Sequence, residues 1–250
     1  MPYTAHRDFE TPPDRTTVWR YMDFLKFVGL LEGRALWFLS LDKLEDPREG
    51  RLTPRTKELL LRREQGDGDR MLHAYQEVWR PAMLVNCWHA SKTESAAMWK
   101  LYSPRGYGIA IRSSIVRLKR GLASAQGPVM IGKVKYVDTN RFCHTDIPNA
   151  LTLCLVKDRS FAHEREVRLV RSMLLDKTPG TANGQSDSSA HGQANLPSGM
   201  PVAVNVAVVM KEVLVDPNAE SWVRDLVERS LVHFGIRRVV RQSDLFRLPN

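Results

Sequence analysis

Apolar residues recur along the chain in short blocks, some with the spacing of strands and others with the spacing of helices. Blocks rich in β-branched and aromatic residues, or with alternating polarity, predict strands at residues 17–24, 35–41, 83–90, 104–114, 132–138, from about 166, 201–209, 212–217 and 237–241. Apolar positions at helical spacing predict helices at residues 25–33, 54–63, 69–79, 117–122, 150–156 and 223–234. The chain therefore alternates short strands with short helices.

Three local signals refine this outline. Ser91 and Glu94 have capping-box spacing, so we expect a helix to begin after Ser91. Residues 44–50, LEDPREG, combine acidic and turn-forming residues and predict a turn. Residues 178–201 contain one Leu and one Met and no aromatic or β-branched apolar residue, which is too little to offset the entropy of ordering them. We expect that segment to be a mobile loop.

The order of elements indicates the fold class. Strands and helices follow one another without a regular βαβ repeat and without an internal repeat. We expect an α+β fold, with a mixed, largely antiparallel sheet and short flanking helices. Residues 1–250 are expected to form a single domain, in which residues 1–16 are flexible and precede the first strand.

Composition narrows the class of protein. The chain has 250 residues, of which 43% are hydrophobic and 26% charged, so it can bury a sizeable core. It has no apolar stretch long enough to span a bilayer and no signal-peptide pattern, so we expect a cytoplasmic protein without a membrane association. Its three cysteines, Cys87, Cys143 and Cys154, form no CxxC pair, which favours reduced thiols over a disulfide framework.

The charge balance adds one candidate partner. Thirty-seven Lys and Arg against 28 Asp and Glu leave a formal charge of +9, which would attract nucleic acid or another polyanion. A non-catalytic nucleic-acid-binding module is therefore one hypothesis, and solubility explains the charge equally well. The residues that would dock nucleic acid are Arg117, Lys119, Arg120, Lys133 and Lys135.

The helix after Ser91 holds the first set of candidate binding residues. Ser95, Trp99 and Tyr102 are spaced i, i+4, i+7, so they share one helix face and could present two aromatic rings to a planar ligand. The same stripe is also how an amphipathic helix packs its aromatic residues into a core. Both interpretations stay open from the sequence.

Two carboxylates and a guanidinium form the second candidate set. If their segment is extended, Glu164, Glu166 and Arg168 project from one side of the sheet, where the two like charges would need a cation, a ligand hydroxyl or a general-acid role. If the segment is helical, Glu164 and Arg168 form an ordinary i, i+4 ion pair.

The third candidate set lies on the first strand. Arg20 and Tyr21 follow a short apolar entry into what should be a core strand, where a guanidinium is unusual unless it faces a cleft or a carboxylate. A bidentate grip on a phosphate or carboxylate suits Arg20, and so does extension to the surface.

Metal sites have little support in the sequence. No group of His, Cys, Asp or Glu has a recognisable ligand spacing, so we expect no metal centre. A metal-dependent nuclease with Asp158 and Glu164 or Glu166 as its carboxylate pair remains a third hypothesis. It lacks the expected Lys, because Arg168 follows Glu166.

The motifs together carry a family resemblance. The order WRYMDF, LDKLEDPREG, CWHASKTESAAMWKLYSPRGYGIAI, SFAHEREVRLV and VLVDPNAESW resembles a large bacterial family of cytoplasmic domains of unknown function. That family is remotely similar, in element order, to the split-sheet fold of ADP-ribosyltransferases. The resemblance implies NAD as a substrate and no covalently bound cofactor. It implies that Arg20 holds the dinucleotide, that Tyr102 or Trp99 stacks on the nicotinamide, and that Glu166 or Glu164 hydrogen-bonds the ribose.

The leading hypothesis is thus a cleft between the first strand, the helix that ends at Tyr102, and residues 164–168. We expect this cleft to bind NAD or a related nucleotide and to transfer or hydrolyse ADP-ribose. The catalytic candidates are Glu166 and Glu164. The ligand-binding candidates are Arg20, Tyr21, Ser95, Trp99, Tyr102 and Arg168. The sequence leaves open which of the two glutamates faces the cleft.

Overall fold

The computed structural model describes residues 2–63, 68–103, 106–144, 149–175 and 196–246. The strands are β1 (Thr17–Asp23), β2 (Ala35–Ser40), β3 (Met83–Ala90), β4 (Gly108–Ser114), β5 (Met130–Lys133), β6 (Lys135–Val137), β7 (Val156–Asp158), β8 (Glu166–Ser172), β9 (Gly199–Ala203), β10 (Glu212–Val215) and β11 (Val240–Gln242). The helices are α1 (Phe24–Gly33), α2 (Pro54–Arg63), α3 (Gly68–Ala74), α4 (Arg80–Ala82), α5 (Ala96–Tyr102), α6 (Ile115–Gly121), α7 (Ala150–Leu153), α8 (Val206–Val209) and α9 (Ser221–His233), with shorter turns η1 (Leu41–Lys43), η2 (Tyr75–Trp79, a π-helix), η3 (Leu122–Ser124) and η4 (Arg159–Glu164).

Within the described residues, nine strands form one sheet and β6 pairs with β7 in a second, parallel pair. The main sheet runs β11-β10-β4-β1-β3-β2-β9, and β8 and β5 continue it from β3. Every pair in it is antiparallel except β10 with β11. The expected α+β fold with a mixed, largely antiparallel sheet is confirmed.

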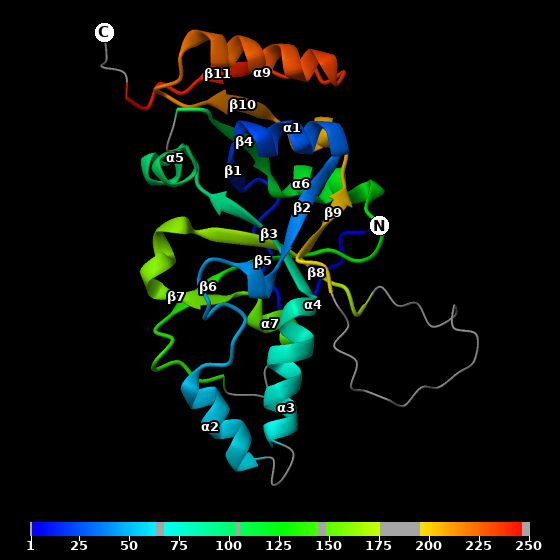
Figure 1. Ribbon diagram of the computed structural model, residues 1–250, viewed down its shortest axis with the longest axis vertical. Helices are drawn as coiled ribbons and strands as arrows, with labels where there is room; N and C mark the ends of the chain where they lie inside the picture. The colour runs from blue at the N-terminus through cyan, green and yellow to red at the C-terminus, as the bar shows by residue number, and fades with distance from the viewer. Residues whose placement is uncertain (1, 64–67, 104–105, 145–148, 176–195, 247–250) are drawn as a thin grey trace, which may run out of the picture.

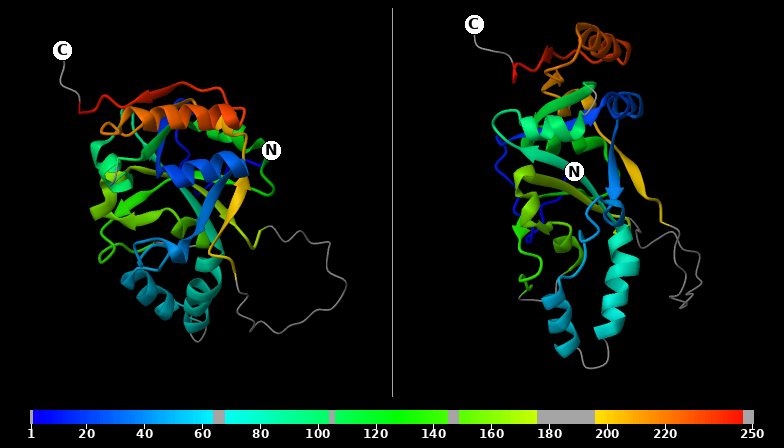
Figure 2. Two further views of the ribbon diagram at one scale, coloured as in Figure 1. Left: turned by 45° about the horizontal axis from the view of Figure 1, so that its top comes forward. Right: turned by 60° about the vertical axis from the view of Figure 1, so that its left-hand side comes forward.

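Helices cover the sheet on both faces (Figure 1). Residues of α1, α6, α8 and α9 pack on one face in the largest apolar cluster, with strand residues such as Val18 and Trp88. On the opposite face α5 packs Met98 and Trp99 against Trp19. Helices α2 and α3 lie side by side and extend from the far end of the sheet, as the turned views in Figure 2 show. In the described residues no helix is both long and apolar enough to cross a membrane.

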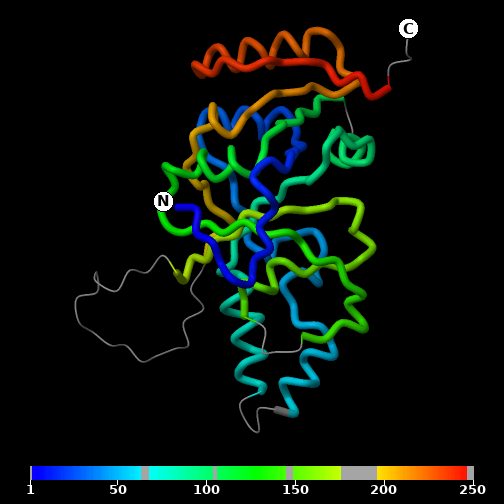
Figure 3. The backbone as a smooth tube through the Cα atoms, turned by 180° about the vertical axis from the view of Figure 1, so that it is seen from behind, coloured from blue at the N-terminus to red at the C-terminus, as the bar shows by residue number. Residues whose placement is uncertain are grey.

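The N-terminal segment, for which we expected flexibility, packs along the sheet in the structure. The Thr4 N–H donates to the Val129 carbonyl at 2.9 Å, and Tyr3 forms a parallel bridge with Val129. The Phe9 ring is buried among residues of β5 and β8. In the view from behind, the first residues run beside the sheet before β1 begins (Figure 3). Most of residues 178–201, expected to be mobile, lie outside the described residues.

Four predicted boundaries differ from the structure. Helix α5 begins after Ser95, because the Ser95 hydroxyl, not that of Ser91, accepts from the N–H three residues on. The strand expected at 201–209 stops at Ala203, since Asn205 caps α8. The strand expected at 132–138 is divided between β5 and β6, which belong to different sheets. The helix expected at 150–156 ends at Leu153.

Candidate functional site

A fork in the sheet creates the main cavity of the described structure. Strand β8 pairs with β3 along Met83–His89, so β1 and β2 must share the other edge of β3. Strand β1 pairs there with His89 and Ala90, and β2 pairs with Leu84 and Val85. Between these contacts residues 86–88 have no partner strand on that edge. The cavity at the fork has a volume of about 580 Å³ and is lined by residues of β1, β2 and β3.

Helix α1 connects β1 to β2 and forms one wall of this cavity. Asp23 caps the helix by accepting from the Lys26 N–H at 2.8 Å. Lys26, Gly29 and Gly33 then face the cavity from successive turns. A Cβ atom added at Gly29 or Gly33 would meet no atom within 4 Å. The helix therefore exposes backbone where a side chain would occupy the cavity, which allows close approach of a ligand.

The glycines of α1 that line the cavity, Gly29 and Gly33, lead to a first prediction. We expect Gly29→Ala to raise the free energy of unfolding by about 0.5–1 kcal/mol, because Ala is the better helix former and the added methyl group enters open space. Gly121→Ala in α6 is the contrast, since its Cβ would lie 2.3 Å from Val209 Cγ2 and should destabilise. Denaturant unfolding measures both. A destabilised Gly29→Ala variant would contradict the open wall.

Arg20 projects into the fork from β1. Its Nη1 donates to the Cys87 carbonyl at 2.7 Å, on the unpaired part of β3. Among the described residues no carboxylate lies within 4 Å of this guanidinium, whereas Arg112 on β4 and Arg168 on β8 each pair with a glutamate. Burial lowers the pKa of Arg20. A desolvated cation without an acidic neighbour favours an anionic ligand.

Aromatic side chains line the same cavity as Arg20. Tyr21 is buried, and its hydroxyl accepts from the Ser95 N–H at 2.9 Å. Tyr102 lies at the end of α5, and burial raises its pKa to about 12, so its hydroxyl is neutral. Trp37 on β2 also lines the cavity and is 52% exposed. These rings offer apolar, flat surface beside the cation.

Three predicted binding residues do not line the cavity, and the structure gives each a structural role. Ser95 caps α5. Trp99 is buried in an apolar cluster, and its indole N–H donates to Glu94 at 2.9 Å. The Trp99 ring therefore packs into the core, which is the second of the two interpretations of this helix face. Arg168 is 1% exposed and its three donor groups are all engaged within the protein.

Glu164 and Glu166 both line the cavity, but they belong to different elements of the chain. The sequence suggested that an extended segment aligns them. In the structure only Glu166 lies in β8, whereas Glu164 ends η4. Arg165 between them is in the left-handed region (φ 43°), which reverses the chain and brings both carboxyl groups to Lys157.

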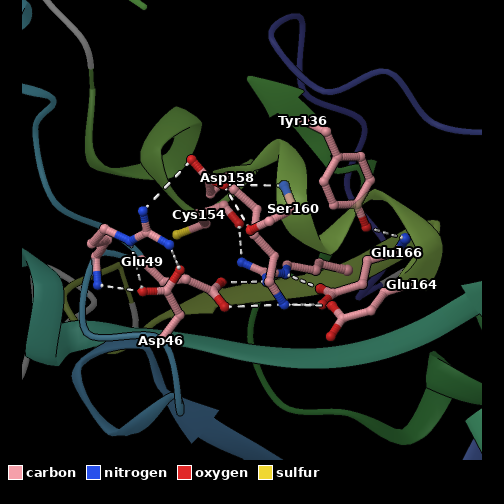
Figure 4. A network of polar contacts seen from close by, with 11 residues as sticks. Asp46, Glu49, Tyr136, Cys154, Asp158, Ser160, Glu164 and Glu166 are labelled. Carbon is pink, nitrogen blue, oxygen red and sulfur yellow. Dashed lines mark hydrogen bonds and ion pairs between the residues drawn. The ribbon is translucent and has the colours of Figure 1, made fainter. Parts of the chain in front are cut away.

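A buried ion network holds this pair (Figure 4). The Lys157 Nζ lies 2.5 Å from Glu164 Oε2, 2.8 Å from Glu166 Oε1 and 3.2 Å from Glu49 Oε1. The Arg168 Nε donates to Glu166 Oε2 at 2.5 Å, its Nη1 to the Cys154 carbonyl at 2.8 Å, and its Nη2 to Glu49. Both oxygens of Glu166 are therefore engaged by cations, while only one oxygen of Glu164 meets Lys157.

The two carboxyl groups differ in their proton affinity. Burial, and a hydrogen bond to Glu166, raise the pKa of Glu164 to about 7. Burial also opposes ionisation of Glu166, but the charges of Arg168 and Lys157 outweigh it and hold its pKa well below the ordinary value. Near neutral pH the pair therefore contains one ionised carboxylate and one group close to its midpoint.

Sequence reasoning missed four contributors to this site, namely Trp37, His89, Glu49 and Lys157. His89 lines the cavity, and its Nδ1 lies 2.6 Å from the Glu164 carbonyl, which can only accept, so Nδ1 carries the proton. Burial lowers the pKa of His89, which leaves a neutral ring. Glu49 and Lys157 come from a turn and a three-residue strand that no motif singled out. The only sequence signal for Glu49 was its place in the acidic turn LEDPREG.

The other candidate sites have different surroundings. Asp158 accepts from Thr139 and Ser160 and lines a separate cavity of about 220 Å³, so it does not share a cavity with Glu164 or Glu166 as a nuclease pair would require. The described residues contain no group of three or more His, Cys, Asp and Glu able to hold a metal ion.

The basic residues proposed for nucleic acid are largely engaged. Lys119 pairs with Asp14 at 2.7 Å and Lys133 with Glu10. Arg117 donates to the Val208 carbonyl at 2.8 Å, and Lys135 lies 4.9 Å from the Phe142 ring centroid. Docking of nucleic acid through Arg117, Lys119, Arg120, Lys133 and Lys135 stays a prediction.

Known proteins show little similarity to this chain. No protein-family model matches the chain, and no curated protein is significantly similar in sequence. Two solved structures of Thermus sp. 2.9 DarT are similar at 11% identity. The complex with NAD⁺ has a TM-score of 0.42 over 93% of this chain and 98% of that chain. The complex with carba-NAD⁺ has a TM-score of 0.40 over 92% and 96%.

Proposed function

We propose that the cavity at the fork binds NAD or a closely related dinucleotide and that the protein transfers or hydrolyses ADP-ribose. One observation carries the proposal: Arg20, the rings of Tyr21, Tyr102 and Trp37, and the carboxyl groups of Glu164 and Glu166 line a single cavity. They come from four separate segments of the chain. A volume of about 580 Å³ is within the usual range for small-molecule and cofactor sites.

Each group has a role that suits this ligand. The guanidinium of Arg20, without an acidic neighbour, would bind the pyrophosphate. The exposed faces of Trp37 and Tyr102 would contact the flat nicotinamide or adenine rings. Glu164 and Glu166 would lie near the ribose, where cleavage of the nicotinamide–ribose bond develops positive charge that a fixed carboxylate stabilises.

In the proposed reaction one bond to ribose C1′ breaks and another forms, and no redox partner is needed. The bond between ribose C1′ and the nicotinamide nitrogen breaks, and its electron pair leaves with neutral nicotinamide. Water or an acceptor hydroxyl then bonds to C1′ and loses its proton to a carboxylate of the site or to solvent. Both transfer and hydrolysis follow this scheme, and they differ only in the nucleophile.

A direct binding experiment tests the function. Calorimetric titration of the purified protein with NAD, combined with chromatographic detection of released nicotinamide, should show saturable binding and slow release. Absence of binding at millimolar NAD, together with absence of nicotinamide release, would refute the proposal. ADP-ribose serves as a second ligand that lacks the scissile bond and should still bind.

Two exposed tryptophans give a matched pair of variants. Trp37 lines the cavity at the fork and is 52% exposed, whereas Trp222 on α9 is 46% exposed and lies outside it. We expect Trp37→Ala to weaken NAD binding roughly 5- to 150-fold, because stacking on an aromatic ring contributes about 1–3 kcal/mol per base. Trp222→Ala should bind NAD like the wild type. Equal affinities in all three proteins would exclude Trp37 from the ligand site.

A further inference from the structure

We propose that Lys157 and Arg168 act as positioning residues that keep Glu166 ionised and leave a single proton on Glu164, so that the cavity presents Glu164 as its neutral, hydrogen-bond-donating carboxyl group. The first support is the geometry of Glu166. Arg168 engages one of its oxygens at 2.5 Å and Lys157 the other at 2.8 Å. A carboxylate with a cation on each oxygen strongly resists protonation.

The second support is the balance of charge in the buried network. Glu49, Glu164 and Glu166 carry three negative charges when ionised, and Lys157 and Arg168 carry two positive charges. All five side chains are nearly or fully buried. An uncompensated buried charge is costly, so the network is most stable when it binds one proton.

The third support locates that proton. Glu49 contacts both cations, through Lys157 at 3.2 Å and through Arg168. Glu166 also contacts both. Glu164 contacts only Lys157, so it gains least from staying ionised, and it is held beside Glu166 by the reversal at Arg165. The raised pKa of Glu164 and the lowered pKa of Glu166 agree with this assignment.

Among the described residues, no cation other than Lys157 and Arg168 lies within 4 Å of a carboxyl oxygen of Glu164 or Glu166. The Tyr136 hydroxyl on β6 accepts from the Glu166 N–H at 2.8 Å, and burial raises the pKa of Tyr136. Burial likewise keeps Cys87, His89 and Tyr102 neutral. The cations that face the pair are Lys157 and Arg168, with Arg20 further along the cavity.

The consequence for the ligand rests on the proposed function. A neutral Glu164 does not repel the phosphates of a dinucleotide, and when a ligand is bound its single proton can be donated to a ribose oxygen in place of Glu166. The ionised Glu166 next to it supplies the fixed negative charge. Lys157 and Arg168 would thus control the reaction through the two glutamates, without contacting the substrate.

The test is a carboxyl titration that needs no ligand. Protein labelled with ¹³C at the glutamate carboxyl groups is titrated from pH 5 to 9 by NMR, as wild type and as Glu164→Gln, Glu166→Gln and Lys157→Met. We expect one wild-type resonance with a midpoint near pH 7 that disappears in Glu164→Gln. Loss of the like charge should lower the midpoint in Glu166→Gln, and loss of the cation should raise it by roughly one unit or more in Lys157→Met.

Controls separate the alternatives. Lys92→Met removes an exposed lysine and should leave the midpoint unchanged, and Lys157→Arg should largely preserve it. If Lys157→Met does not fold, the wild type and the two glutamine variants still locate the proton. The proposal is overturned if no glutamate titrates above pH 6, if the midpoint belongs to Glu166, or if a folded Lys157→Met titrates like the wild type. A confirmed titration in a protein that does not bind NAD would overturn the proposed function alone.

Discussion

Arg20→Met is expected to weaken NAD binding roughly 10- to 150-fold while leaving the free energy of unfolding nearly unchanged. The loss follows because a hydrogen bond to a charged group contributes about 1.5–3 kcal/mol. Stability should change little, because removal of a desolvated cation that has no carboxylate within 4 Å in the described structure offsets the loss of the donor that Arg20 provides to the Cys87 carbonyl. A methionine keeps the length and apolar character of the side chain. Calorimetry measures the affinity, and denaturant unfolding measures the stability.

The control for Arg20 is Arg55→Met. Arg55 is exposed on α2, away from the fork, and its loss removes the same formal charge. If Arg55→Met and Arg20→Met lower the affinity equally, the effect is due to net charge and not to the site. If Arg20→Met unfolds the protein, Arg20 has a structural role that the geometry does not suggest.

Arg168→Met is expected to have the largest effect on stability, a loss of about 3–5 kcal/mol in the free energy of unfolding. Its removal leaves Glu166 and Glu49 buried with Lys157 as their only cation within 4 Å among the described residues. It also leaves the Cys154 carbonyl without the donor that Arg168 provides. Chemical denaturation followed by circular dichroism measures the change.

Arg112 on β4 gives the matched control for Arg168. It pairs with Glu212 at 3.2 Å at a more exposed position, so Arg112→Met should cost about 1 kcal/mol or less. In the double variant Arg168→Met with Glu166→Gln, removal of the unpaired carboxylate should restore part of the stability. Similar losses for Arg168→Met and Arg112→Met, or an absence of coupling in the double variant, would show that the network is not the cause.

Local rules sufficed for most of the fold. The bounds of α2 and β3 follow from periodicity, and the end of α1 from Gly33. Local rules were insufficient where two residues could each begin the same helix. Ser91 and Ser95 can both cap a helix, and Ser95 prevails in a structure where the Tyr21 hydroxyl accepts from its N–H. That contact joins residues 74 positions apart and leaves no mark in the local pattern.

The sequence singled out several residues that line the cavity, among them Arg20, Glu164 and Glu166, but it did not reveal the cavity itself. The unusual position of Arg20 on a core strand and the acidic pair beside Arg168 are visible in the sequence. The fork is not, because residues 83–90 have the mostly apolar pattern of a buried strand, and nothing in them shows that two strands share one edge. The role of Arg168 was also hidden, since its partner Glu49 lies 119 residues away.

The fork also divides the sheet into two parts. In the described parts of the chain, strand pairing between the part that contains β4 and β10 and the part that contains β2 and β8 is confined to Val18 with Ala90 and Trp19 with His89. A ligand bound in the cavity would contact both parts of the sheet. It would therefore connect them at a second place, in addition to the two residue pairs between β1 and β3. Ligand binding should therefore reduce the motion of the two parts relative to each other, including that of their outer strands.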